Sequence, residues 1–236
     1  METLAQHYQD VCERITQAAR ACGRDPQSVR LLAVSKTFGL DAIRAVAACG
    51  QLDFGENYIQ EGVDKIRQLR ADTASAPLVW HCIGPIQSNK TRLVAEHFDW
   101  VHSVDRLKIA QRLSEQRPAG LPDLQICLQV NIDGGETKSG VAPADLFELA
   151  QAVAALPRLR LRGLMAIPDP VPDSSAMLAV HLRTAKVWRE LQSRLPGNNL
   201  DVLSMGMTAD LSLAIQAGST MVRVGTAIFG RRDNIG

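Results

Sequence analysis

Paired cysteines, long apolar runs and an excess of one charge are all missing from this sequence. The five cysteines are scattered and form no Cys-x-x-Cys pair, so they predict neither a disulfide framework nor a metal site. Lys and Arg number 26 against 25 Asp and Glu, which gives a net charge of +1. That balance excludes a charge-driven attraction of the whole surface to nucleic acid or to an anionic membrane. A charged ligand would therefore bind at a local site.

Targeting segments are lacking as well. The sequence begins at Met1 without the basic and then apolar segments of a signal peptide, and no stretch approaches the ~18 apolar residues that span a membrane. A cytoplasmic protein is the expectation. The 236 residues, of which 46% are hydrophobic and 22% charged, are typical of a compact globular chain with a sizeable core.

A regular alternation of strand and helix patterns runs through the chain. Apolar residues from Leu4 to Cys22 recur at steps of three and four, which predicts a helix that ends at Gly23. Eight short aliphatic runs follow, each before a stretch of helical spacing. These runs are Val29–Ser35, Leu52–Gly55, Leu78–Ile83, Trp100–Ser103, Leu124–Asn131, Leu159–Met165, Asp201–Ser204 and Thr220–Val224.

Strict alternation of this kind predicts a parallel sheet with right-handed crossovers. Eight units in roughly 200 residues is the number at which such a sheet closes on itself. The predicted fold is therefore an α/β TIM (β/α)8 barrel with an extra N-terminal helix, and residues 1–236 are expected to form a single domain. An open, doubly wound sheet is the alternative.

The working groups of a parallel barrel lie where its strands end, because the loops there converge on one mouth. Lys36 directly follows the aliphatic run Leu31–Val34, so we expect its amine to project into the mouth above apolar walls. Loss of water disfavours the charged ammonium, and a neutral amine can attack an aldehyde to form an imine. A structural lysine that extends toward solvent or pairs with Glu56 is the alternative.

The last two strand ends carry the groups of a phosphate site. Ser204 offers a hydroxyl, Gly206 allows close approach of the backbone, and Gly225-Thr226-Ala227 can present backbone N–H groups at the start of a short terminal helix. Barrel enzymes frequently bind phosphate after strands seven and eight. An ordinary turn would explain Gly225 alone. A reactive lysine and a phosphate site in one mouth together predict an aldehyde-bearing phosphate ligand.

Six segments, in chain order, resemble the pyridoxal phosphate homeostasis proteins, which have the barrel of the alanine racemase N-terminal domain without the second domain. The segments are Ala33–Thr37, Phe54–Glu61, Trp80–Lys90, Arg162–Met165, Ser204–Asp210 and Arg223–Gly230. The resemblance implies that the cofactor is pyridoxal 5'-phosphate (PLP). It also implies a set of roles: Lys36 holds PLP as an internal aldimine, Ser204, Gly225 and Thr226 bind the phosphate, and Arg223 faces the pyridine nitrogen.

The resemblance further implies that Asn57, His81 and Met165 line the pocket, although His81 could equally be a core histidine. Two positions depart from the family pattern, which often has Ser at Thr208 and His at Pro85. Thr208 keeps the hydroxyl. Pro85 offers no polar side chain at its position.

Arg223 bears on the chemistry in its own right. A guanidinium stays protonated, so it can donate to a pyridine nitrogen but cannot accept the proton of that ring. An unprotonated ring is a weaker electron sink. Racemisation also needs a second acid or base opposite Lys36, which racemases supply as a Tyr from another domain of a partner subunit. Because this sequence contains Tyr8 and Tyr58 alone, we expect no catalytic residues.

The leading hypothesis is a non-enzymatic protein of PLP (vitamin B6) homeostasis that buffers or delivers PLP, with indirect effects on amino-acid metabolism. A PLP-dependent amino-acid racemase of low activity, with Tyr58 or Cys82 as the opposing base, stays open. So does a class I aldolase-like lyase in which Lys36 attacks a sugar-phosphate ketone.

The expected partners follow from the leading hypothesis. They are PLP itself and apo PLP-dependent enzymes as candidate recipients, with no nucleic acid and no membrane. The chain is expected to be a monomer or a weak homodimer. Lys138, after the fifth strand, is a further candidate at the border of the pocket.

Overall fold

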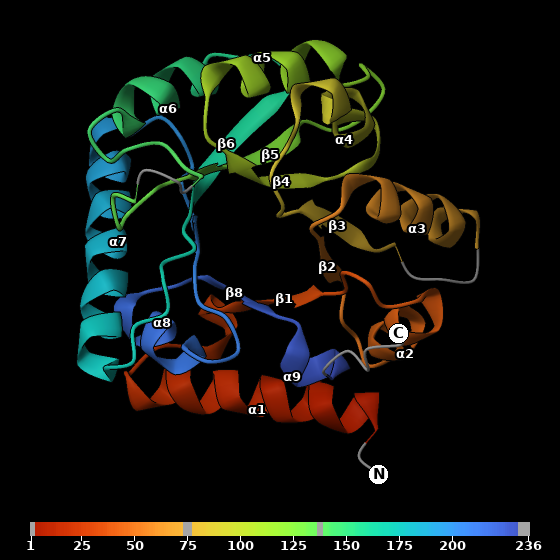
Figure 1. Ribbon diagram of the computed structural model, residues 1–236, viewed down its shortest axis with the longest axis vertical. Helices are drawn as coiled ribbons and strands as arrows, with labels where there is room; N and C mark the ends of the chain where they lie inside the picture. Colours follow the sequence, from red (N-terminus) through yellow and green to blue (C-terminus); the bar gives the residue numbers. More distant parts are fainter. Residues whose placement is uncertain (1–2, 73–76, 136–138, 231–236) are drawn as a thin grey trace.

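Eight parallel strands form a closed barrel in chain order, with β8 hydrogen-bonded to β1. The computed structural model describes residues 3–72, 77–135 and 139–230. Its strands are β1 (Arg30–Val34), β2 (Asp53–Glu56), β3 (Val79–Cys82), β4 (Trp100–Val104), β5 (Leu124–Gln129), β6 (Leu159–Met165), β7 (Val202–Ser204) and β8 (Met221–Val224). Figure 1 views this barrel along its axis, with helices around the outside. The predicted (β/α)8 barrel is confirmed, and the open sheet is excluded.

Helices cover the outer face of the strands. They are α1 (Leu4–Ala21), α2 (Leu40–Ala48), α3 (Ile59–Ala71), α4 (Thr91–His97), α5 (Leu107–Gln116), α6 (Leu146–Ala154), α7 (Ser174–Arg194), α8 (Leu211–Ala217) and α9 (Thr226–Phe229), with 3-10 turns at Pro26–Ser28 and Ser88–Lys90. Among the described residues, no helix has both the length and the apolar character needed to cross a bilayer. No group of three or more His, Cys, Asp or Glu in the same ranges is arranged to hold a metal ion.

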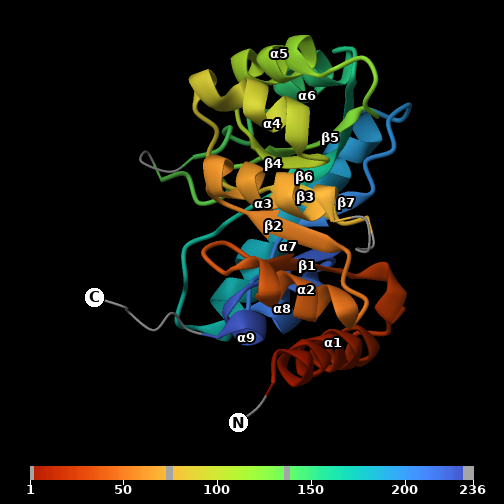
Figure 2. The same ribbon diagram turned by 90° about the vertical axis from the view of Figure 1, so that its right-hand side faces the viewer.

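The extra N-terminal helix is present as predicted. α1 packs against α2, α8 and α9, as Figures 1 and 2 show from two directions. The hydroxyl of Thr3 accepts the backbone N–H of Gln6 at its start, and the chain turns away at Gly23, whose φ of +71° is one that glycine adopts without strain. The buried face of α1 consists of Val11, Ile15 and Ala19.

Side chains alternate between two layers along each strand. The larger layer lies between the strands and the helices. The smaller one fills the interior of the barrel with Leu32, Val34, Ile83, Trp100, Cys127, Met165, Val202 and Met221. Barrel interiors are mostly filled by branched aliphatic residues. Here the same interior also buries His81, His102, Ser204 and Arg223, and these polar groups connect the body of the barrel to its mouth.

Candidate functional site

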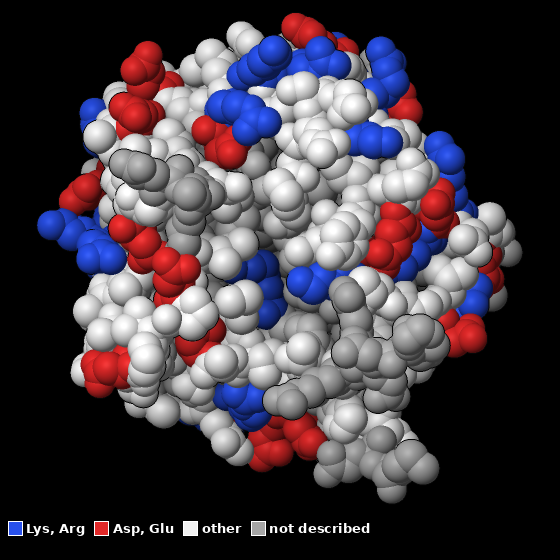
Figure 3. All heavy atoms as spheres, viewed as in Figure 1, with Lys and Arg blue, Asp and Glu red and all other residues white. Residues whose placement is uncertain are grey.

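Lys36 lies at the mouth, in the turn that follows β1. Leu32 and Val34 face the barrel interior, and Lys36 continues that alternation two residues later, where its side chain is half-buried. β1 pairs with β2 on one side and β8 on the other, and Ala33 lies beside Val224 in the register. Lys36 is therefore close to the segment that follows β8. In the view down the barrel, Lys and Arg atoms lie in the hollow at the centre of the molecule (Figure 3).

Charged groups from α3 hold the backbone on both sides of Lys36. Lys65 Nζ donates to the carbonyl oxygen of Ser35 at 2.8 Å, and Glu61 accepts the backbone N–H of Thr37. Thr37 has a φ of +68°, which is unusual for a residue that carries a side chain. The turn therefore depends on contacts from another element to keep its shape.

A buried ion-pair cluster underlies this turn. Lys65 lies 2.8 Å from one carboxylate oxygen of Glu56 and 2.6 Å from one of Glu61. Ser35 Oγ donates to the same Glu56 oxygen at 2.7 Å. Burial raises the pKa of Glu56 above its ordinary value, although Lys65 and Ser35 oppose the shift. The carboxylate predicted as an alternative partner of Lys36 is thus bonded to Lys65 and Ser35.

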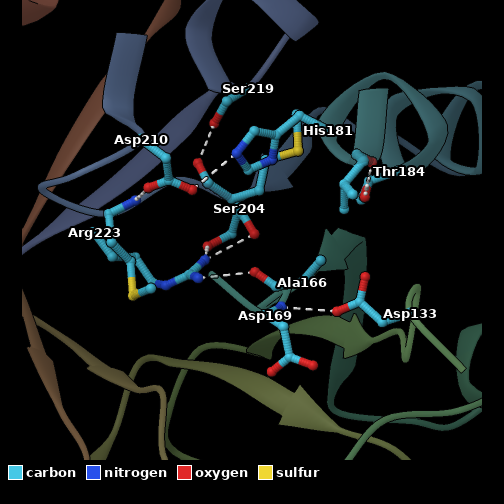
Figure 4. A network of polar contacts seen from close by, with 12 residues as sticks. Asp133, Ala166, Asp169, His181, Thr184, Ser204, Asp210, Ser219 and Arg223 are labelled. Carbon is cyan, nitrogen blue, oxygen red and sulfur yellow. Dashed lines mark hydrogen bonds and ion pairs between the residues drawn. The ribbon is translucent and has the colours of Figure 1, made fainter. Parts of the chain in front are cut away.

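Arg223 is buried in the barrel just below the mouth. Its Nη1 donates to the carbonyl oxygen and to the hydroxyl of Ser204, both at 2.8 Å, and its Nη2 donates to the carbonyl oxygen of Ala166 at 2.9 Å (Figure 4). Burial lowers the pKa of Arg223 to about 10, which still leaves the guanidinium charged at neutral pH. The charged group is therefore fixed between the ends of β6 and β7.

The loop between β7 and α8 is held in place by three side chains. Gly206 has a φ of +93°, and a Cβ there would collide with Ala214. Asp210 accepts the backbone N–H of Met207 at 2.7 Å. It also bonds His181 at 2.8 Å, as Figure 4 shows. Arg14, on α1, donates to the carbonyl oxygen of Thr208 at 3.0 Å.

The same loop brings Thr208 to the start of α9. The Thr208 hydroxyl lies 3.3 Å from that of Thr226, and this pair is exposed. Gly225 immediately precedes Thr226, and a Cβ on it would come within 3.2 Å of the carbonyl oxygen of Val34. Two hydroxyls and a glycine backbone therefore face the mouth beside the end of β1.

Comparison with known proteins identifies the family. The sequence model of the alanine racemase N-terminal domain matches residues 8–233. The pyridoxal phosphate homeostasis protein of Pseudomonas aeruginosa is 58% identical over 233 residues, which are 99% of this chain and 97% of that protein. The chain belongs to the pyridoxal phosphate homeostasis protein family.

Solved structures agree with this family membership. PipY from Synechococcus elongatus PCC7942, determined with PLP bound, has a TM-score of 0.80 at 38% identity, over 92% of this chain and 100% of PipY. An alanine racemase from E. faecalis has a TM-score of 0.70 at 17% identity, over 96% of this chain and 59% of the racemase. The second likeness concerns the barrel fold alone.

The site residues implied by the family resemblance occupy different depths in the barrel. Lys36, Gly225 and Thr226 lie at the mouth, and half-buried Asn57 follows β2. Met165 is fully buried in the interior and pairs with Ser204 in the register. Lys138 lies outside the described residues.

Two of these residues have their polar atoms engaged inside the protein. The Ser204 hydroxyl is bonded to Arg223 and lies 3.0 Å from His102 Nδ1. His81 is fully buried, with Nε2 at 2.8 Å from Asp53 and Nδ1 at 2.9 Å from His102. Since both ring nitrogens are satisfied, the geometry favours the alternative of a core histidine. The phosphate contact of Ser204 stays a prediction.

Sequence reasoning missed several supporting residues. Glu61 and Lys65 are one helical turn apart on α3, and this spacing was a usable signal for an ion pair. Asp53 and His102 bond His81 from neighbouring strands, a relation that no local pattern contains. Thr208 was visible only as a departure from the family pattern.

Proposed function

We propose that this chain binds PLP in the mouth of its barrel and serves PLP homeostasis by holding the cofactor and releasing it to other proteins. Three unlike groups on neighbouring strands carry the proposal: the Lys36 amine after β1, the Arg223 guanidinium on β8, and the hydroxyl pair of Thr208 and Thr226. PLP has three matching groups, namely an aldehyde, a pyridine nitrogen and a phosphate. The solved relative PipY, which has PLP bound, supports the assignment.

Gly225 and Arg223 both suit this ligand. Any side chain at Gly225 would crowd the end of β1 at Val34, so glycine keeps space next to Lys36. Arg223 uses three N–H contacts on Ser204 and Ala166, whereas a guanidinium has five N–H donors. Donors therefore remain for a ring nitrogen above it.

Each side chain has one task in the proposed complex. Lys36 is the covalent attachment point, and Arg223 donates a hydrogen bond to the pyridine nitrogen. Thr208, Gly225 and Thr226 hold the phosphate, and the predicted contact of Ser204 would require its hydroxyl to leave His102 Nδ1. Bound PLP would supply an aldehyde that combines reversibly with amines. Arg223 stays charged and cannot take up the ring proton, so the site suits storage of the cofactor better than chemistry that depends on a protonated ring.

The side chains considered as an opposing base support a carrier over an efficient racemase. Cys82 is fully buried, and burial raises the pKa of its thiol to about 12. Tyr58 has 54% of its surface exposed, so it is not enclosed with a substrate. A base must be within hydrogen-bond reach of the proton that it abstracts and must titrate near the working pH. Neither residue meets both conditions.

We propose that residues 1–236 form one domain, that the protein works in the cytoplasm as a monomer or weak homodimer, and that apo PLP-dependent enzymes receive the cofactor.

Absorption spectroscopy of the purified protein tests the proposal. Protein incubated with PLP and freed of excess is expected to keep a visible band, which Lys36→Ala abolishes or displaces. Lys186→Ala, which removes an exposed lysine on α7, is the matched control and is expected to behave as the wild type. A wild type without a band, or a Lys36→Ala band identical to that of the wild type, would overturn the proposal.

A further inference from the structure

A continuous line of hydrogen-bonded side chains crosses the barrel interior from Asp53 to Arg223. Asp53 Oδ1 lies 2.8 Å from His81 Nε2, and His81 Nδ1 lies 2.9 Å from His102 Nε2. His102 Nδ1 lies 3.0 Å from Ser204 Oγ, which accepts from Arg223 Nη1 at 2.8 Å. The five side chains belong to β2, β3, β4, β7 and β8. We call this line the interior chain.

The chemistry of its two ends fixes the direction of every hydrogen bond. Arg223 can only donate, so Ser204 Oγ accepts from it and has its own O–H left for His102 Nδ1. His102 then carries its proton on Nε2 and donates to His81 Nδ1. His81 in turn carries its proton on Nε2 and donates to the Asp53 carboxylate. If the hydrogen bonds ran in the reverse direction, His81 Nε2 would carry no proton and would face the Asp53 carboxylate.

The electrostatic environment agrees with this arrangement. Burial lowers the pKa of both His81 and His102, and the positive charges of Arg223 and Arg30 add to the shift at His102. Burial alone would raise the pKa of Asp53, but its contacts with His81 and the charge of Arg30 bring it below the ordinary value. Two neutral rings thus join a carboxylate to a guanidinium.

We propose that Asp53, His81 and His102 are positioning residues that act through Ser204 to set the orientation of Arg223, and so the strength of its hydrogen bond to the pyridine nitrogen of PLP. This inference rests on the proposed function. The interior chain holds the Ser204 hydroxyl as an acceptor toward Arg223. Linked hydrogen bonds in a buried site polarise and strengthen one another. A change at Asp53, which is partly exposed, would therefore alter the hydrogen bond that Arg223 makes at the mouth.

The location of the chain supports a role beyond packing. Barrel interiors gain stability from branched aliphatic side chains, and a buried polar group costs free energy unless all of its partners are in place. Leu32 and Cys127 show that apolar or weakly polar residues occupy the same interior layer on other strands. A line of polar residues that ends on Arg223 is thus placed where it can act on the site.

Nitrogen NMR of the apo protein with labelled histidine tests the interior chain without PLP. Both rings are expected to be neutral and protonated on Nε2 at pH 7. Asp53→Asn, which keeps the shape of the side chain, is expected to change the tautomer populations of His81 and His102. A ring that is charged, or protonated on Nδ1, in the wild type would overturn the inference even if PLP binds.

The effect on the mouth is measured with PLP labelled with 15N in its ring. Asp53→Asn and His102→Phe are expected to move the pyridine 15N signal toward that of a ring without a hydrogen bond, and to raise the Kd for PLP about tenfold. Cys127→Ala, which changes the same interior layer at a residue outside the interior chain, is the control. It is expected to leave the pyridine 15N signal in place. Melting temperatures confirm that each variant is folded.

The outcomes separate the two proposals. A wild type that binds no PLP overturns the proposed function, while the histidine tautomers still decide whether the interior chain exists. A wild type that binds PLP, with Asp53→Asn leaving both the 15N signal and the Kd unchanged, overturns the positioning role alone. If His102→Phe does not fold, the result for the milder Asp53→Asn decides whether the positioning role holds.

Discussion

Arg223 occupies a position where another cation cannot replace a guanidinium. Its two terminal nitrogens reach Ser204 on β7 and Ala166 after β6 at the same time. A lysine has a single nitrogen on a flexible stem and cannot span both acceptors in a fixed geometry. Arg223→Lys is therefore expected to raise the Kd for PLP about tenfold or more, as measured by absorbance titration. Arg189→Lys, at an exposed position on α7, serves as control, and equal affinities for the two variants would contradict the account.

The buried histidines predict how stability depends on pH. His81 and His102 have folded-state pKa values below the ordinary value, because burial disfavours the charged ring. As the pH falls below about 6.5, protons bind to these rings in the unfolded chain but not in the folded one, so the free energy of unfolding decreases.

His102→Phe removes one of these two contributions. Its stability is expected to fall less steeply from pH 7 to pH 5, with a difference in slope of up to about 1.4 kcal/mol per pH unit. Urea denaturation of both proteins at three pH values measures this difference. Parallel curves would show that His102 already binds a proton in the folded state.

Single side chains could be predicted from sequence where a neighbouring pattern fixes their place. Lys36 was expected at the mouth because it directly follows the aliphatic run Leu31–Val34, whereas the role of Arg223 was implied by the family resemblance. The partner of a buried polar group could not be predicted from sequence. Ser204 meets His102 across the barrel, 102 positions away in the sequence, and such contacts exist only once the sheet has closed.

At the scale of elements, α3 stabilises the turn that presents Lys36. Replacing Lys65 with Met would leave the buried carboxylate of Glu56 and the partly exposed carboxylate of Glu61 without their cation, and removal of one partner from a buried ion pair costs about 3–5 kcal/mol. Lys65→Met is thus expected to lower the melting temperature by roughly 6–20 °C for a chain of this size. Lys186→Met is the matched exposed control. A variant as stable as this control would mean that the cluster does not support the turn.

The positions of the elements could be predicted closely, whereas the geometry of the turns could not. The strand β6 matches its predicted bounds, Leu159–Met165, where buried Leu159 and Leu161 alternate with arginines and buried Leu164 and Met165 follow. Gly163 in the same strand has a φ of +153°, and a Cβ there would collide with the carbonyl oxygen of Val202. That requirement comes from β7, and the sequence of β6 alone does not contain it.

At the scale of the whole molecule, ligand binding and folding are linked. A ligand at 100 times its Kd that binds the folded state alone adds about 2.7 kcal/mol to the free energy of unfolding. The melting temperature is therefore expected to rise by roughly 5–10 °C as PLP approaches this excess. Lys36→Ala should show a smaller rise at the same PLP concentration. Thermal denaturation across a series of PLP concentrations measures the rise for both proteins. Identical rises for the wild type and Lys36→Ala would mean that PLP binding does not depend on Lys36.

The closed barrel as a whole could be predicted because eight similar units leave few ways to arrange a parallel sheet. The interior polar residues were less predictable, since a histidine in a buried strand is more often a satisfied core residue. His81 is a satisfied core residue of this kind, yet it also belongs to the interior chain, which reaches the mouth.

Peptide mapping by mass spectrometry after borohydride reduction of the PLP-loaded protein tests the central claim most directly. The account predicts a reduced pyridoxyl group on the peptide that contains Lys36, at close to one per chain. Modification spread over exposed lysines, or concentrated on another lysine with Lys36 unmodified, would contradict it.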